Sequence, residues 1–225
     1  MSVETNPGVE KKLRLFARLL SEANERVRLV GPSDENVIYE EHIQDALAAS
    51  RLLDALPPES KFADIGTGGG IPGTVWCASR PDMEGVMADS VGKKIKIARE
   101  ISEALGLKNA TFVNARSEDL AASRREAFDA ASARAVADSR VTAEYLAPLV
   151  KVGGILIAFK GAKVHDEIGL PAPLWLKLGL SAPSLAPYSV SGKELSLLTW
   201  KKIAPCTSRF PRKPGDAKRE PWWAK

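Results

Sequence analysis

The pattern of apolar and polar residues divides the chain into a helical front and an alternating core. Apolar side chains recur at helical spacing over residues 9–30 and again over residues 35–56, so two helices are expected there. Pro57 and Pro58 end the second helix, because proline does not continue a helix. We therefore expect residues 1–58 to form a short N-terminal helical extension beside the main fold.

Beyond this extension, short apolar runs alternate with segments of helical periodicity. Such alternation is typical of a parallel sheet with helices on both faces. Two further runs, near residues 186–190 and over residues 196–202, predict an antiparallel hairpin that closes the sheet. The fold class is thus α/β with a seven-stranded, mostly parallel sheet, and its core is expected over residues 59–206. The other strands are predicted at residues 61–65, in a run that ends at Asp89, and at residues 110–114, 128–132 and 155–159.

A glycine-rich turn follows the first of these strands and defines the candidate site. The stretch Asp64–Gly73 reads D-I-G-T-G-G-G-I-P-G, which lets the backbone pass close to a ligand and then turn into a helix. Asp89 ends the second strand, where a carboxylate can accept both hydroxyls of a ribose. Because the carboxyl ends of parallel strands meet at one edge of a sheet, these features predict a nucleoside site.

Asp64 distinguishes two classes of nucleoside cofactor that use such turns. The run Gly68–Gly73 fits the dinucleotide pattern G-x-G-x-x-G, but an acid just before the glycines faces a pyrophosphate unfavourably. S-adenosylmethionine has no phosphate. It carries a sulfonium and an ammonium group, and a carboxylate attracts such positive charges. The spacing D-x-G-x-G-x-G, with an acid on the second strand, is the methyltransferase form. The residues expected to bind S-adenosylmethionine are Asp64, Gly66, Gly68, Gly70 and Asp89.

The residues after the fourth strand limit the methyl acceptor. Exocyclic amino groups of bases are usually methylated by Asn/Asp-Pro-Pro-Tyr-like residues, whereas residues 129–134 read D-A-A-S-A-R. Methylation of a pyrimidine carbon needs a thiolate, and Pro205-Cys206 lies in the tail, outside the sheet edge. Ring nitrogen 7 of guanine carries a free lone pair and needs no general base. Catalysis would then consist of holding acceptor and methyl group in line, with Arg134 as the best candidate for polar contacts.

The positive charge of the chain lies in its C-terminal part. Residues 201–225 carry eight basic and two acidic side chains, a net charge of +6, whereas residues 1–200 carry a net charge of −2. A basic end on a nearly neutral body is typical of a protein that binds a polyanion, but a solvated terminus has the same composition. Residues 207–225 are rich in proline and are expected to form an irregular basic tail.

Composition argues against several other classes of protein. Hydrophobic content of 44% is ordinary for a globular chain, and no apolar run is long enough to span a bilayer. The polar first residues do not resemble a signal peptide, so a cytoplasmic protein without membrane contact is expected. Cys77 and Cys206 lie far apart, and with two histidines besides they predict neither a disulfide framework nor a metal site. Nothing in the sequence demands a partner subunit, so a monomer is expected.

Two groups of polar residues allow both a functional and a structural interpretation. His42 and Asp45 could face the site, although we favour a helix histidine at the interface between extension and core. Lys93, Lys94 and Lys96 follow the second strand and could contact phosphate, but they suit the solvated face of a helix better.

In combination, these motifs resemble the bacterial small-subunit rRNA methyltransferase G family, RsmG or GidB. The resemblance covers nearly the whole chain and rests on the combination, because each piece alone is common. Its parts are the glycine turn Asp64–Gly73, residues 88–94, 115–118, 132–135 and 159–161, the upstream helix segment 41–47 and the basic segment Arg209–Gly215.

The resemblance implies a Rossmann-like class I S-adenosylmethionine-dependent methyltransferase. It implies methylation of N7 of a guanine in the 530 loop of 16S rRNA (guanine 527 in rRNA numbering), with 16S rRNA or the 30S subunit as partner. Gly66 and Ile71 would then line the cofactor. Ser117 and Glu118 would meet its adenine, and Arg134 would lie by the cofactor and the acceptor.

The resemblance also favours RNA binding by the tail, with Arg209, Arg212 and Lys213 as the candidate contacts. Two alternatives stay open, a small-molecule methyltransferase and a non-catalytic ribosome-assembly factor that binds RNA. The basic tail speaks against the first. The intact glycine turn with Asp89 speaks against the second, since a pure RNA binder has no need of a nucleoside site.

Overall fold

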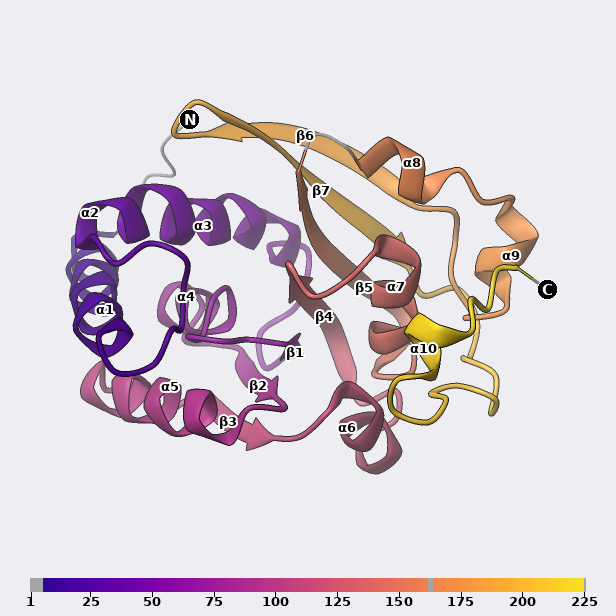
Figure 1. Ribbon diagram of the computed structural model, residues 1–225, viewed down its shortest axis with the longest axis horizontal. Coiled ribbons are helices and arrows are strands. Elements are labelled where there is room, and N and C mark those ends of the chain that lie inside the picture. The colour runs from indigo at the N-terminus through magenta and orange to yellow at the C-terminus, as the bar shows by residue number, and fades with distance from the viewer. Residues whose placement is uncertain (1–5, 162–163, 225) are drawn as a thin grey trace.

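A twisted seven-stranded sheet runs through the centre of the computed structural model, which describes residues 6–161 and 164–224 (Figure 1). The strand order is β3-β2-β1-β4-β5-β7-β6. The first five strands are parallel, and β7 is antiparallel to both of its neighbours. The predicted sheet and its closing hairpin are thus confirmed. The strands are β1 (Lys61–Ile65), β2 (Glu84–Asp89), β3 (Ala110–Asn114), β4 (Phe128–Arg134), β5 (Val150–Gly161), β6 (Ser184–Val190) and β7 (Lys193–Lys201).

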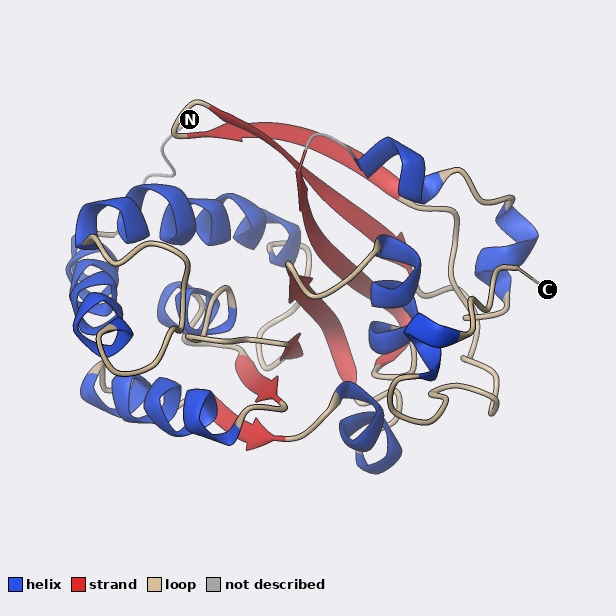
Figure 2. Cartoon of the chain, viewed as in Figure 1, coloured by secondary structure: helices blue, strands red, loops and turns tan. Residues whose placement is uncertain are grey.

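Helices cover both faces of this sheet (Figure 2). Neighbouring residues of β1 show why, since Phe62 packs into one hydrophobic cluster and Ala63 into another on the opposite face. On the Phe62 face lie α4 (Gly73–Ser79) and α5 (Gly92–Ala104), and Gly106 ends α5 with a φ of +67°. The Ala63 face and the C-terminal part carry α6 (Ser117–Ser123), α7 (Ser139–Leu146), α8 (His165–Ile168), α9 (Ala172–Leu176) and α10 (Asp216–Arg219).

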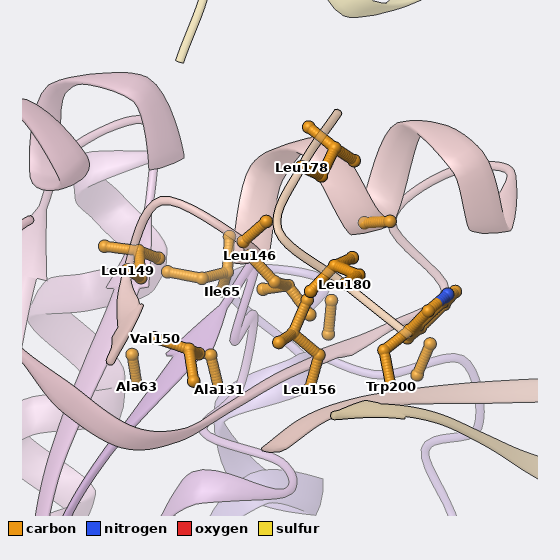
Figure 3. Close-up of a cluster of buried hydrophobic side chains, with 14 of the residues drawn as sticks. Ala63, Ile65, Ala131, Leu146, Leu149, Val150, Leu156, Leu178, Leu180 and Trp200 are labelled. Carbon is orange, nitrogen blue, oxygen red and sulfur yellow. The ribbon is translucent and has the colours of Figure 1, made fainter. Parts of the chain in front are cut away.

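Figure 3 shows the hydrophobic cluster on the Ala63 face of the sheet. Ile65 and Leu156 meet Leu146 from α7, and Leu180 lies beside Trp200 of β7. All of these side chains are at most 4% exposed. The cluster fixes α7 against β4 and β5, which matters because α7 supplies one wall of the site described below.

The extension is helical as predicted, but its first helix ends early. The helix α1 (Pro7–Asn24) ends at Asn24, whose side chain accepts hydrogen bonds from Leu29 and Val30 and donates to Pro32. These bonds satisfy the backbone of a loop that the apolar pattern had assigned to the helix. The second helical run comprises α2 (Glu35–Val37), the π-helix η1 (Ile38–Ile43), α3 (Gln44–Ser50) and the short 3-10 helix η2 (Arg51–Leu53).

The extension packs directly on the glycine turn. Phe16 and Leu20 of α1 share one buried cluster with Ile71 and with α4. The indole Nε1 of Trp76 on α4 donates to the carbonyl of Ala46 at 2.8 Å. The extension and the first half of the core therefore share one hydrophobic interior.

The C-terminal tail has an irregular backbone apart from the short helix α10, but it packs on the core. Phe210 and Trp222 are buried in the same cluster as α7 and α9. Arg125 donates to the carbonyls of Phe210, Cys206 and Thr207, and Glu126 accepts from the backbone of Cys206 at 2.7 Å. The proline spacing predicted the irregular backbone, but it does not reveal these buried aromatic contacts. None of the helices in the described ranges combines the length and apolar character needed to cross a membrane.

Candidate functional site

The glycine turn after β1 requires its glycines. Gly66, Gly68 and Gly70 have φ angles of +70°, +55° and +94°, a region that side chains disfavour. A Cβ atom at Gly66 would lie 2.6 Å from a methyl of Val136, and one at Gly70 would lie 2.5 Å from the hydroxyl oxygen of Thr74. The turn therefore cannot carry side chains without moving its neighbours.

Asp64 holds this turn together from inside the protein. Its Oδ2 accepts from the Thr67 hydroxyl at 2.6 Å and from the backbone N–H of Gly73 at 3.0 Å. Its Oδ1 accepts from the Ser132 hydroxyl at 3.0 Å. The carboxyl is fully buried, and this burial raises its pKa to about 6. These bonds occupy Asp64 with the two ends of the turn, which speaks against the predicted direct contact with a cofactor.

Asp89 lies at the carboxyl end of β2 and faces the turn. Its Oδ2 accepts from the backbone N–H of Gly68 at 3.0 Å, and its Oδ1 accepts from the N–H of Val91 at 2.9 Å. A carboxylate oxygen can accept more than one hydrogen bond, so both oxygens keep capacity for ribose hydroxyls. The position and the chemistry of Asp89 fit the predicted ribose ligand.

A pocket of about 180 Å³ opens beside Asp89, at the carboxyl ends of β1 and β2. It contains four of the predicted cofactor residues: Gly66, Asp89, Ser117 and Glu118. Ser117 begins α6 and donates its hydroxyl hydrogen to the carbonyl of Tyr145 at 2.6 Å, which ties α6 to α7. The pocket also contains side chains that the sequence did not single out: Val136, Tyr145 and Lys218.

Other predicted cofactor residues do not line this pocket. Ile71 is buried against α1, and a Cβ atom at Gly70 would meet Thr74 and Phe16, so both face the interior. Gly68 donates its backbone N–H to Asp89 and so helps to orient this pocket residue. These positions shape the turn, whereas Gly66 is the glycine that faces the pocket.

Arg134 ends β4 and joins the core to the extension. Its Nε lies 3.1 Å from Oδ2 of Asp45, and its Nη2 contacts Nδ1 of His42. The hydroxyl of Tyr188 on β6 donates to Asp45, which is 4% exposed. The pair His42 and Asp45 thus lies at the predicted interface, and it also contacts the candidate catalytic arginine.

The charge state of His42 suits an acceptor role. Burial, followed by the charge of Arg134, lowers the pKa of His42 to about 4. The imidazole is therefore neutral at pH 7 and can accept from Arg134, while its Nε2 is buried without a hydrogen-bond partner. Arg134 is held in one orientation by a neutral ring on one side and a buried carboxylate on the other.

The tail residues predicted to bind RNA have different environments. Arg209 and Lys213 are exposed. Arg212 instead forms a bidentate ion pair with buried Glu144. Its Nε donates to Oε1 at 2.7 Å, and its Nη2 donates to Oε2 at 2.6 Å. This ion pair speaks against the predicted RNA contact of Arg212. Lys202 is likewise buried and bonded to Glu126 at 2.9 Å, so part of the basic charge of this region belongs to the core.

Two further predictions can be compared with the structure. Lys93 and Lys96 on α5 are exposed, as a solvated helix face requires. Cys206 is 5% exposed, and burial raises the pKa of its thiol to about 11, which fits a packing role better than a nucleophile. Within the described residues, no group of three or more His, Cys, Asp or Glu side chains could hold a metal ion.

The sheet order, the glycine turn and the acid on β2 together define the class I methyltransferase fold. The solved structure of precorrin-6y C5,15-methyltransferase from Geobacter metallireducens GS-15 has this fold, with a TM-score of 0.55 at 14% identity. The match covers 71% of this chain and 88% of that chain.

Sequence comparison narrows the class to a family. The family model described as GidB, rRNA small subunit methyltransferase G, matches residues 9–185. Ribosomal RNA small subunit methyltransferase G of Clostridium perfringens is 32% identical over 225 residues, which cover 98% of this chain and 94% of that protein. The protein of the same name from Moorella thermoacetica is 33% identical, covering 93% and 88%. The chain belongs to the rRNA small subunit methyltransferase G family and is a methyltransferase.

Proposed function

We propose that this protein methylates N7 of a guanine in the 530 loop of 16S rRNA and uses S-adenosylmethionine as methyl donor. The observation that carries the proposal is the pocket in which Gly66, Asp89, Ser117 and Glu118 converge at the carboxyl ends of β1 and β2. Its acceptor groups match the hydroxyls of a ribose and the amino group of an adenine. The names of the relatives and the basic tail support rRNA as the substrate.

Each residue of the pocket has a role in this proposal. Gly66 lets the backbone line the pocket beside Val136, since a Cβ atom there would lie 2.6 Å from a Val136 methyl and would displace it. Asp89 accepts the ribose hydroxyls, and Ser117 with Glu118 holds the adenine at the start of α6. Asp64 preorganises the turn through its three hydrogen bonds rather than by touching the ligand.

Arg134 is the proposed positioning group on the acceptor side. When bound, S-adenosylmethionine supplies an electrophilic methyl group on its sulfonium. Guanine N7 presents a lone pair without a proton, so the protein needs no general base, and the low pKa of His42 makes it a poor base at neutral pH. Asp45 and His42 fix the guanidinium of Arg134, which can then orient the acceptor at low entropic cost.

Deletion of the gene tests this proposal directly. Chemical cleavage specific for 7-methylguanosine in 16S rRNA should disappear from the 530 loop, and the wild-type gene should restore it. The variant Asp89→Asn should restore it less completely than the wild-type gene does, although the protein accumulates normally. Unchanged cleavage in the deletion strain would overturn the proposal. Methylation of naked 16S rRNA and of 30S subunits in vitro would show which of the two is the substrate.

A further inference from the structure

Lys218 lies at the cofactor pocket although it comes from the far end of the chain. It belongs to α10 and lines the pocket together with Asp89, Ser117, Glu118 and Tyr145. The match to the family model ends at residue 185, before this segment. Figure 1 shows α10 lying against α7, and the two helices are in contact.

Buried contacts hold Lys218 in this place. Arg212, on the N-terminal side of α10, pairs with Glu144 of α7, and both side chains are at most 9% exposed. Ala217, the residue before Lys218, is buried. On the C-terminal side of α10, the indole of Trp222 is buried and donates to the carbonyl of Arg140 at 3.0 Å. The segment around Lys218 is thus fixed at several points to the helix that carries Tyr145.

The chemistry of the pocket has room for a donor of this kind. Asp89 and Glu118 provide carboxylate acceptors, which match the ribose hydroxyls and the exocyclic amino group of adenine. Adenine also presents ring nitrogens that accept hydrogen bonds, and a lysine ammonium offers three donors and no acceptor. Lys218 complements the acceptor side of the base, where carboxylates cannot serve.

We propose that Lys218 is a cofactor-binding residue whose ammonium donates to a ring nitrogen of the adenine, so that the C-terminal segment forms one wall of the cofactor site. This inference rests on the proposed use of S-adenosylmethionine. The tail then has two uses, since Arg209, Lys213 and Lys218 are all exposed but only Lys218 among them lines the pocket.

Titration calorimetry of the full chain with S-adenosylhomocysteine, without RNA, tests the inference. Lys218→Met keeps most of the aliphatic stem and removes the charge, and it should weaken binding roughly three- to tenfold. Lys218→Arg should retain most of the affinity. The matched control is Lys108→Met, at an exposed lysine that does not line the pocket, which should bind as the wild type does. Equal melting temperatures would show that the variants are folded.

Analogues of S-adenosylhomocysteine in which one ring nitrogen is replaced by carbon give a second, independent readout. If Lys218 donates to that nitrogen, the wild type and Lys218→Met should bind one of the 1-, 3- or 7-deaza analogues equally well. A constant ratio across all analogues, or wild-type affinity in Lys218→Met, would overturn the inference. Normal cofactor binding with weakened 30S binding would assign Lys218 to RNA instead. Failure of the wild-type chain to bind at all would overturn the proposed function as well.

Discussion

Asp64 and Asp89 lie near the carboxyl ends of neighbouring strands, yet their carboxylates face different surroundings. Asp64 is fully buried and accepts hydrogen bonds from both ends of the glycine turn. Asp89 lines the pocket and accepts a single backbone N–H at each oxygen. The first residue shapes the turn, and the second remains able to bind a ligand.

This difference predicts opposite results for two equivalent substitutions. Asp64→Asn keeps one oxygen for Thr67 and Gly73, and its amide can donate to the Ser132 hydroxyl, so cofactor affinity should stay within about threefold of the wild type. Asp89→Asn loses one acceptor for the ribose and should weaken binding by about tenfold or more. Calorimetry with S-adenosylhomocysteine measures both. A larger loss of affinity in Asp64→Asn than in Asp89→Asn would indicate that Asp64 contacts the ligand directly.

The buried carboxyl of Asp64 also predicts a pH dependence of stability. Burial raises its pKa from 3.8 to about 6, so the folded protein holds this proton more tightly than the unfolded chain. The resulting stabilisation is fully present below pH 3.8 and is lost as the pH rises through 6. It amounts to about 3 kcal/mol at about 1.4 kcal/mol per pKa unit.

Urea unfolding of the wild type and of Asp64→Asn at several pH values measures this effect. The free energy of unfolding of the wild type, relative to the variant, should decrease between pH 4 and pH 7. A difference that does not change over this range would contradict the pKa given for Asp64.

The pleat of β1 explains why Asp64 is enclosed in the protein although it ends an apolar run next to the glycine turn. Side chains alternate along a strand, so Asp64 shares the Phe62 face, whereas Ala63 and Ile65 share the other. The alternation is readable from the sequence, but which face the pocket opens on depends on how the turn and the helices pack. Lys218 and Tyr145 were missed for the same reason, since no local pattern brings them to β2.

At the scale of elements, the second helical run of the extension reaches the end of β4. The π-helix η1 carries His42, and α3, which follows it, carries Asp45, and both side chains contact Arg134. Irregular π turns are often found at functional sites. The helical pattern predicted the run, but a one-residue change in helical geometry alters which side chains face the core.

This contact predicts that Asp45 acts on methyl transfer through Arg134. Asp45→Asn removes the charge that holds the guanidinium, so kcat should fall roughly tenfold while the affinity for S-adenosylhomocysteine changes little. Asp54→Asn, at an exposed aspartate just after the same run, serves as the control. Methylation of 30S subunits under saturating cofactor gives kcat. An unchanged kcat in a folded Asp45→Asn variant would show that Asp45 does not position Arg134 for methyl transfer.

The tail is an element whose stability depends on one buried ion pair. Arg212→Ala leaves the buried carboxylate of Glu144 without its partner and should lower the free energy of unfolding by about 3 kcal/mol. Lys213→Ala, at the exposed neighbouring position, should change it by less than about 0.5 kcal/mol. Urea unfolding compares the two variants. Equal stability of both would mean that the tail contributes little to the fold.

At the scale of the whole molecule, the mostly parallel sheet and its closing hairpin were predictable because each strand is a short apolar run in an alternating chain. The packing of the N-terminal and C-terminal segments on the core was not predictable from the sequence. Trp222 lies 5.6 Å from Trp175, ring centre to ring centre, and neither residue shows this in its local sequence. The first and the last described helices thus both pack near the site, with α1 on the glycine turn and α10 at the pocket.

This architecture decides how RNA binding by the tail can be tested. Truncation after Cys206 would remove Phe210 and Trp222 from the core, so a loss of RNA affinity could reflect unfolding. The double variant Arg209→Ala/Lys213→Ala removes exposed charges alone. If both side chains contact phosphates, affinity for 16S rRNA should fall, and the slope of log K against log salt should decrease in magnitude by roughly 1.5.

The matched control for this experiment is Lys108→Ala, an exposed lysine at the amino end of β3 and thus at the opposite edge of the sheet. Its slope should equal that of the wild type, because a residue at that edge lies away from the carboxyl ends where the pocket opens. Filter binding over a range of salt concentrations measures all three proteins. Equal slopes for the wild type and the double variant would show that the exposed tail charges do not contact phosphate, and rRNA would then have to be held by other basic residues around the site.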